Sequence, residues 1–158
     1  MRLFPKVPQA VKDLPLTERR LAWGVTDEGL AVVATPSALH FGDEVLPWVR
    51  VEKAVWAPPL LSVREVDVRE GAGRAHRFHL DEERDLAGTV RTCVTSSVGW
   101  SEVRTLPGGG KVRVVGRRVP GRDAMEWQAV HLEGTDPDDP TVREQVERLV
   151  AALRATLG

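Results

Sequence analysis

Apolar residues alternate with small or polar ones along most of the first half of the chain. Leu21, Trp23 and Val25 recur with a period of two, which is typical of a half-buried strand. A turn at 27–29, where glycine accepts positive φ, leads to an apolar run at 30–35 that is the predicted hairpin partner. Further extended stretches are predicted at 38–41, 45–56, 60–68 and 74–80. Together these stretches predict a β-meander.

The period then changes to that of a helix. Asp81 is a favourable N-cap, and a helix is predicted at 82–97. Its apolar stripe consists of Leu86, Val90, Cys93, Val94 and Ser97. Strand patterns return in a hairpin at 101–119 and a strand at 125–132.

The last predicted element is an amphipathic C-terminal helix. Asp139 is placed to cap it, and Pro140 occupies the first helical position, where its missing N–H costs nothing. Its apolar face consists of Val142, Val146, Leu149, Val150, Leu153 and Leu157. Strands, one mid-chain helix, more strands and a terminal helix predict an α+β fold with a curved antiparallel sheet or partly open barrel.

The length of 158 residues fits one domain. Residues 1–19 contain three prolines and no apolar period, so they are predicted to form an N-terminal arm with a helical turn at 17–20. Residues 20–158 are predicted to form a single α+β domain.

Three segments resemble the pleckstrin-homology-like superfold, including GRAM-type bacterial domains: LAVVATPSALH (30–40), LPWVRVEKAVW (46–56) and LLSV (60–63). The chain also resembles uncharacterised actinobacterial proteins that end in a similar helix. The resemblance implies a curved antiparallel sheet closed by a C-terminal helix, and a binding or adaptor role. It covers about residues 20–80 and departs from the family by the helix at 82–97.

Composition excludes several classes of protein. Apolar residues make up 42% of the chain, charged residues 28%, and the net charge is −1, so the chain is expected to fold. No segment is long and apolar enough for a membrane-spanning helix, and the N-terminus lacks the pattern of a secretory signal. A single cysteine, Cys93, suits a reducing compartment. We therefore expect a cytoplasmic protein.

The chain has no isoleucine, asparagine or tyrosine, and its 18 arginines outnumber its 4 lysines. This bias is typical of a GC-rich genome, so arginine content alone does not indicate nucleic-acid binding. Because basic and acidic residues are nearly balanced, a nucleic-acid partner is not expected.

No catalytic or metal-binding motif is complete. The run Gly108–Lys111 is followed by valine and a strand, which favours a hairpin turn over a phosphate loop. His76 and His79 are three apart on a predicted strand and should point to opposite faces. We therefore expect no catalytic residues, metal or cofactor, although a small enzyme with an unrecognised pocket stays an alternative.

Two groups of residues are candidates for binding. Trp48 and Trp56 share one strand face and indicate an interface for a protein partner or self-association, unless a bent sheet buries both faces. The second group lies on a hairpin without acidic residues and consists of Lys111, Arg113, Arg117, Arg118 and Arg122. It is either a charged protective strand edge or a site for anionic lipid or phosphate. The sequence thus predicts a non-enzymatic interaction module, with an anion binder as the alternative.

Overall fold

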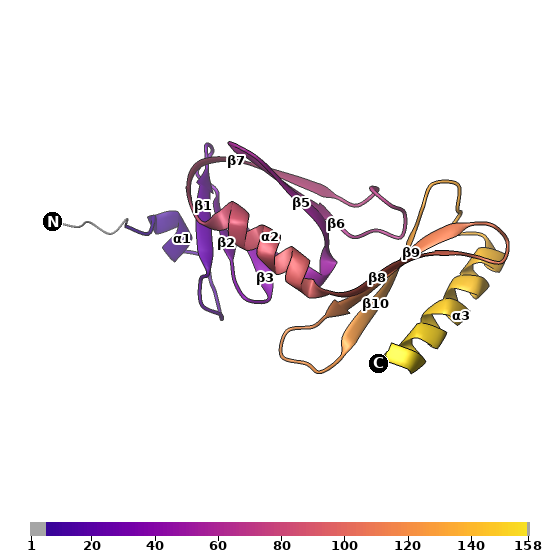
Figure 1. The fold of residues 1–158 in the computed structure, drawn as a ribbon. Helices are drawn as coiled ribbons and strands as arrows, with labels where there is room; N and C mark the ends of the chain where they lie inside the picture. Colours follow the sequence, from indigo (N-terminus) through magenta and orange to yellow (C-terminus); the bar gives the residue numbers. More distant parts are fainter. Residues whose placement is uncertain (1–5, 158) are drawn as a thin grey trace.

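A computed structural model of the chain describes residues 6–157. It contains two antiparallel sheets and three α-helices (Figure 1), which confirms the predicted α+β class. In chain order the elements are α1 (Gln9–Lys12), β1 (Ala22–Thr26), β2 (Ala31–Ala34), β3 (Ala38–Phe41), β4 (Glu44–Pro47), the 3₁₀ turn η1 (Trp48–Arg50), β5 (Val51–Ala57), β6 (Leu60–Glu65), β7 (Ala75–Arg84), α2 (Leu86–Ser97), β8 (Val98–Thr105), β9 (Lys111–Arg118), β10 (Met125–His131) and α3 (Pro140–Leu157).

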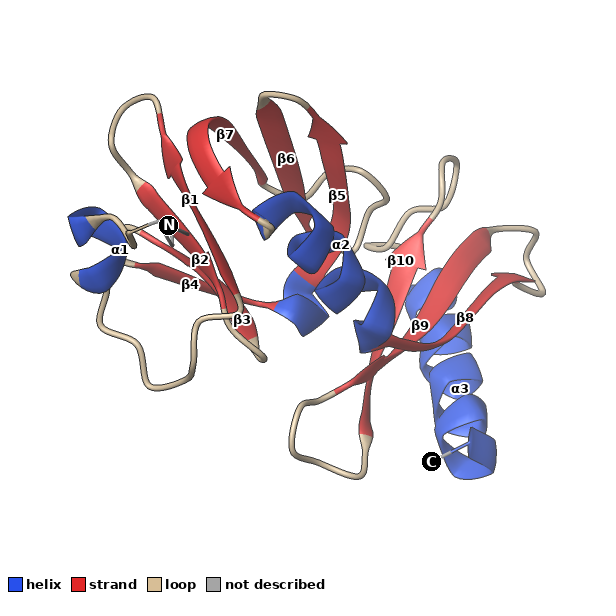
Figure 2. Cartoon of the chain, turned by 60° about the vertical axis from the view of Figure 1, so that its left-hand side comes forward, coloured by secondary structure: helices blue, strands red, loops and turns tan. Residues whose placement is uncertain are grey.

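The larger sheet is a strongly curled half-barrel of seven strands. Its order is β4-β3-β2-β1-β7-β6-β5, so β1 pairs with both β2 and β7 and joins two meanders. Helix α2 packs into the concave face, as Figure 2 shows. Gly24 of β1 permits this approach, since a Cβ at this position would lie 2.8 Å from the Leu86 side chain. The curved sheet and α2 together enclose one core.

The core of the half-barrel combines inward residues of the strands with the stripe of α2. Phe41, Leu61 and Phe78 contribute from the strands, and Leu86 and Val90 from α2. The mid-chain helix, and not the C-terminal one, therefore covers the open face that the resemblance assigned to a terminal helix.

The predicted stripe of α2 is confirmed, but its predicted start is wrong. Strand β7 continues to Arg84, beyond the expected cap at Asp81, because pairing with β1 holds the backbone extended as far as Glu83. Asp85 adopts a φ of 54° between strand and helix. The carboxylate of Glu83 accepts the Ala87 N–H at 3.1 Å and satisfies a free donor of the first turn.

The predicted strand at 45–56 is broken by η1. Pro47 has no N–H to donate to a ladder, and the chain turns so that the Trp48 ring enters the core. The Trp48 indole N–H donates to the carbonyl of Thr35 at 2.9 Å. A register shift between Val51 and Lys53 follows. Both features change the parity of β5, which the sequence pattern did not reveal.

The smaller sheet has the order β10-β9-β8, and α3 packs on one of its faces. Val112 and Val114 of β9 are fully buried there against Val146 and Leu153 of α3. The predicted start of α3 at Pro140 is confirmed, and the Asp139 carboxylate accepts the Thr141 N–H at 2.8 Å.

The expected N-terminal arm packs on the outer face of the half-barrel. Its helix is α1 rather than the predicted turn at 17–20, and Val11 is buried against Trp23 and Val33. Glu18 accepts hydrogen bonds from the hydroxyls of Thr35 and Ser37. Residues 1–5 of the expected arm, including most of the stretch inspected for a secretory signal, lie outside the described residues.

Candidate functional site

Strand β9 turns one face toward α3 and the other toward the half-barrel. Val112 and Val114 face α3. Arg113, Val115 and Arg117 lie on the opposite face and line a cavity of about 420 Å³ between the two sheets. A volume of this size is in the range of small-molecule sites. We call this cavity the inter-sheet pocket.

The inter-sheet pocket has an apolar floor and a charged rim. Three valines of the smaller sheet and Val66, which follows β6, line it, and Val115 and Val130 are buried. Four cationic side chains and two carboxylates surround them, which leaves an excess of two positive charges. These six residues are Lys53, Arg64, Arg113, Arg117, Glu52 and Glu70.

Arg117 is the most unusual of these residues because its side chain is buried without a carboxylate of the described chain in direct contact. It is 4% exposed, and its guanidinium donates to Ser97 Oγ at 2.9 Å and to Gln128 Oε1 at 3.3 Å. Both partners are neutral, and no carboxylate of residues 6–157 pairs with it. Burial lowers the pKa of Arg117, and the negative charges of Glu52 and Glu126 oppose that shift. A buried charge that is not paired directly with a carboxylate is costly, so its retention points to an anionic ligand.

Arg64 and Glu52 also have unused hydrogen-bonding capacity at this pocket. The Arg64 Nε and Glu52 Oε2 atoms lie 3.4 Å apart, close enough for an ion pair. Their alignment is too poor for a hydrogen bond, and both buried atoms lack one among residues 6–157. The Arg64 guanidinium can therefore donate to a bound group.

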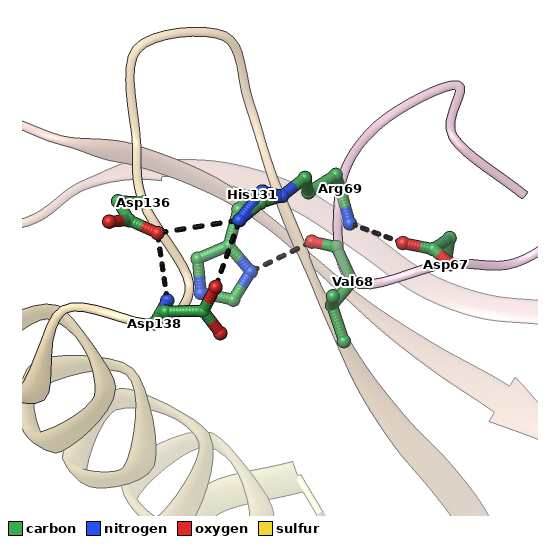
Figure 3. A network of polar contacts seen from close by, with 6 residues as sticks. All are labelled: Asp67, Val68, Arg69, His131, Asp136 and Asp138. Carbon is green, nitrogen blue, oxygen red and sulfur yellow. Dashed lines mark hydrogen bonds and ion pairs between the residues drawn. The ribbon is translucent and has the colours of Figure 1, made fainter.

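A polar network holds one wall of the pocket, the connection between β6 and β7. Arg69 bridges Asp136 and Asp138, and its neighbour Val68 accepts a bond from the His131 ring (Figure 3). These contacts fix Glu70, which pairs with Arg113 at 2.7 Å. The network anchors the wall to the loop between β10 and α3.

The structure divides the five basic candidate residues. Only Arg113 and Arg117 line the inter-sheet pocket. Arg118 donates to the carbonyls of Ser96 and Val98 at the end of α2. Arg122 and Arg118 border a separate hollow of about 370 Å³ beside Trp48, and Lys111 is exposed at the far end of β9. The five residues therefore do not form one exposed row.

The two candidate tryptophans also separate. Trp48 is 2% exposed and belongs to the core, so the expectation that it stands on a surface with Trp56 is corrected. The cause is η1, which rotates its ring inward. Trp56 is half-buried and lines a shallower hollow of about 570 Å³ with Cys93. This second hollow contains no buried unpaired charge of the kind found at Arg117.

His76, His79 and Cys93 lie in different environments. His76 faces the core, where its Nε2 lies 2.6 Å from Glu65 Oε2, and His79 points to the opposite face as predicted. Burial raises the pKa of the Cys93 thiol, which disfavours the nucleophilic thiolate. Residues 6–157 contain no group of three or more potential metal ligands.

Sequence reasoning missed the half of the pocket that comes from the larger sheet. Lys53 and Arg64 are cross-strand neighbours in β5 and β6, far from β9 in sequence. Arg113 and Arg117 could be selected from the sequence because their strand contains basic but no acidic residues. No local pattern connects them to Arg64. The side of the sheet on which Glu52 lies depends on the register shift in β5.

Comparison of the chain with models of known families, with curated proteins and with solved structures found no match. Within residues 6–157, no helix combines the length and the low polarity needed to cross a membrane.

Proposed function

We propose that the protein is a binding module that holds a small phosphate-bearing molecule in the inter-sheet pocket. The observation that carries the proposal is Arg117, a buried guanidinium with two neutral partners beside a cavity of about 420 Å³. Arg64 and Lys53 supply further donors, and the excess of two positive charges matches a phosphate monoester near neutral pH. The valine floor suits an apolar group attached to the phosphate.

The fold supports a binding role of the kind that the resemblance implied. Seven antiparallel strands followed by α2 correspond to a curved sheet closed by the helix after its last strand. We assign a pleckstrin-homology-like unit to residues 20–97 on this basis. The smaller sheet and α3 would then be an addition that completes the pocket, and the role of the whole chain would be that of a non-enzymatic interaction module.

A membrane surface is a less suitable ligand than a small molecule. Arg117 is buried, Arg113 is paired with Glu70, and Arg118 is bonded to backbone carbonyls. A flat surface could not contact these side chains together. The pocket can admit an isolated phosphate group.

The test is calorimetric titration of the protein with phenyl phosphate, inorganic phosphate and benzoate. We expect saturable binding, tightest for phenyl phosphate because it also covers the valine floor. Arg117→Met should weaken it by roughly 10- to 100-fold, since a charged hydrogen bond contributes about 1.5–3 kcal/mol. Lys53→Met, at the exposed rim, should weaken it by up to about fivefold.

Lys12→Met is the matched control, because Lys12 is an exposed lysine of α1 remote from the pocket. It should bind phenyl phosphate like the parent. Thermal melts of each variant establish that it is folded. Absence of saturable binding to the parent, or equal binding by a folded Arg117→Met, would overturn the proposal. Tighter binding of benzoate would contradict the assignment to phosphate.

A further inference from the structure

Strand β8 leaves a long backbone edge unpaired. Its eight residues pair with β9 on one side, and no strand in the described part of the chain pairs with the other. Its outer end, toward Thr105, projects away from the half-barrel in both views (Figures 1 and 2). Val103 is 48% and Trp100 37% exposed on it. A long edge with exposed apolar residues is a template for pairing with another strand.

The other sheet edges are shortened or covered. Strand β4 has four residues and ends in Pro47. Helix α2 packs against β5. The edge of β10 is covered at His131, whose N–H donates to the Val68 carbonyl, and Arg69 forms a bridge there. Natural proteins protect edges by such devices. Strand β8 is the longest of these edge strands, and in the described part of the chain it has neither a proline nor a bridging loop.

We propose that β8 is a homodimer interface, in which two copies of the chain pair antiparallel about a two-fold axis at Val103. The register follows from charge. Glu102 and Arg104 precede and follow Val103 in the strand. Their side chains share one face and bond to each other at 2.7 Å. With the axis at Val103, each Glu102 lies opposite the partner's Arg104. The four side chains then alternate in sign, and opposite charges across strands stabilise pairing.

Neighbouring registers are less favourable. Moving the axis to Glu102 places the two Glu102 side chains opposite each other, and moving it to Arg104 does the same with the arginines. Like charges directly opposite destabilise a strand pair. On the other face, the proposed register places Ser101 opposite the partner's Thr105, a pair of hydroxyls that can bond across the strands.

The small sheet leaves room for a second copy. Helix α3 covers β9 and β10, and a groove of about 430 Å³ separates it from the end of β8. Pairing would extend the three-stranded sheet to six strands and bury both Val103 side chains. The charges on the two sides of Val103 are opposite in sign, so the segment is complementary to a second copy of itself, which favours this chain over an unrelated partner.

The test is sedimentation velocity of the full chain over a range of concentrations, at low salt. We expect a dimer, and we expect Glu102→Arg or Arg104→Glu alone to weaken self-association at least about tenfold, because each places like charges opposite one another twice. An equimolar mixture of the two variants should form a heterodimer, since one strand then carries two arginines and the other two glutamates. The double variant Glu102→Arg/Arg104→Glu should dimerise like the parent.

Glu28→Arg is the matched control, because it reverses the charge of an exposed glutamate in the turn between β1 and β2. It should leave the dimer intact. A monomeric parent at high concentration, single variants that dimerise like the parent, or a mixture that forms no complex would each overturn the proposal. The result is independent of phosphate binding, since none of the altered residues lines the inter-sheet pocket.

Discussion

Several buried polar side chains of this protein bond to specific backbone groups. Trp48 donates to the Thr35 carbonyl, and Gln128 donates to the Val49 carbonyl at 2.6 Å. Such bonds make it possible to bury a polar group in a core, because an unpaired one costs about 1–3 kcal/mol. Arg117 differs in that its hydrogen bonds are made to neutral groups and no carboxylate of residues 6–157 pairs with its charge. This difference distinguishes the proposed binding role of Arg117 from the structural roles of Trp48 and Gln128.

The contacts of Glu18 predict that acid destabilises the protein. Hydrogen bonds from Ser37 lower the pKa of Glu18, so its stabilising contribution is complete above the ordinary glutamate pKa of about 4.3 and is lost as pH falls through the folded value. Burial lowers the pKa of nearby His40, although Glu18 opposes this. The unfolded chain therefore takes up the His40 proton first as pH falls below about 6.5, which also favours unfolding.

We expect the melting temperature to fall between pH 7 and pH 3, measured by circular dichroism. Glu18→Gln should lower it at pH 7, and the difference from the parent should disappear in acid, where the parent carboxyl is also protonated. Glu147→Gln, at an exposed glutamate of α3, is the control and should melt like the parent at each pH. A Glu18→Gln deficit that is equal at pH 7 and pH 3 would contradict this account.

Among the elements, the two longer helices have separate cores. Helix α2 packs in the half-barrel, and α3 packs on the smaller sheet through Val146 and Leu153, each 8% exposed. The sequence pattern alone would select Leu149 for a disruptive substitution because it lies mid-stripe. In the structure Leu149 is only half-buried and borders the groove beside β8.

Val146→Asp should destabilise the smaller sheet by about 3 kcal/mol or more, because it places an unpaired charge in an apolar core. Urea denaturation followed by circular dichroism measures the change in the free energy of unfolding. Ala151→Asp adds the same carboxylate on the exposed face of α3 and should change stability little. If both variants unfold at the same urea concentration as the parent, α3 does not complete a core.

In the whole molecule, buried side chains join the two sheets directly. Gln128 of β10 donates to Val49 beside the half-barrel and accepts from Arg117, which in turn donates to Ser97 at the end of α2. At the surface, Arg50 pairs with Glu126 at 3.6 Å. The interface therefore contains both a buried hydrogen-bond chain and the walls of the proposed site.

Gln128→Leu should destabilise the protein by about 1–3 kcal/mol, because it leaves the Val49 carbonyl and an Arg117 N–H without partners. Urea denaturation measures the loss, and limited proteolysis detects any loosening of one sheet from the other. Gln145→Leu is the control, at a half-buried glutamine of α3 outside this chain. Equal stability of parent and Gln128→Leu would show that the interface does not depend on this bond.

The sequence by itself determined the type of most elements, the start of α3 and the stripe of α2. These features depend on local periodicity and capping, which report the side of an element that is buried. Only the tertiary structure decided what each element is buried against. The pairing of β1 with β7 extended β7 past Asp81, and η1 with the register shift in β5 buried Trp48. Arg117 and Arg64 line the same pocket because the two sheets pack together. Contacts between segments far apart in sequence produce no periodic pattern from which they could be predicted.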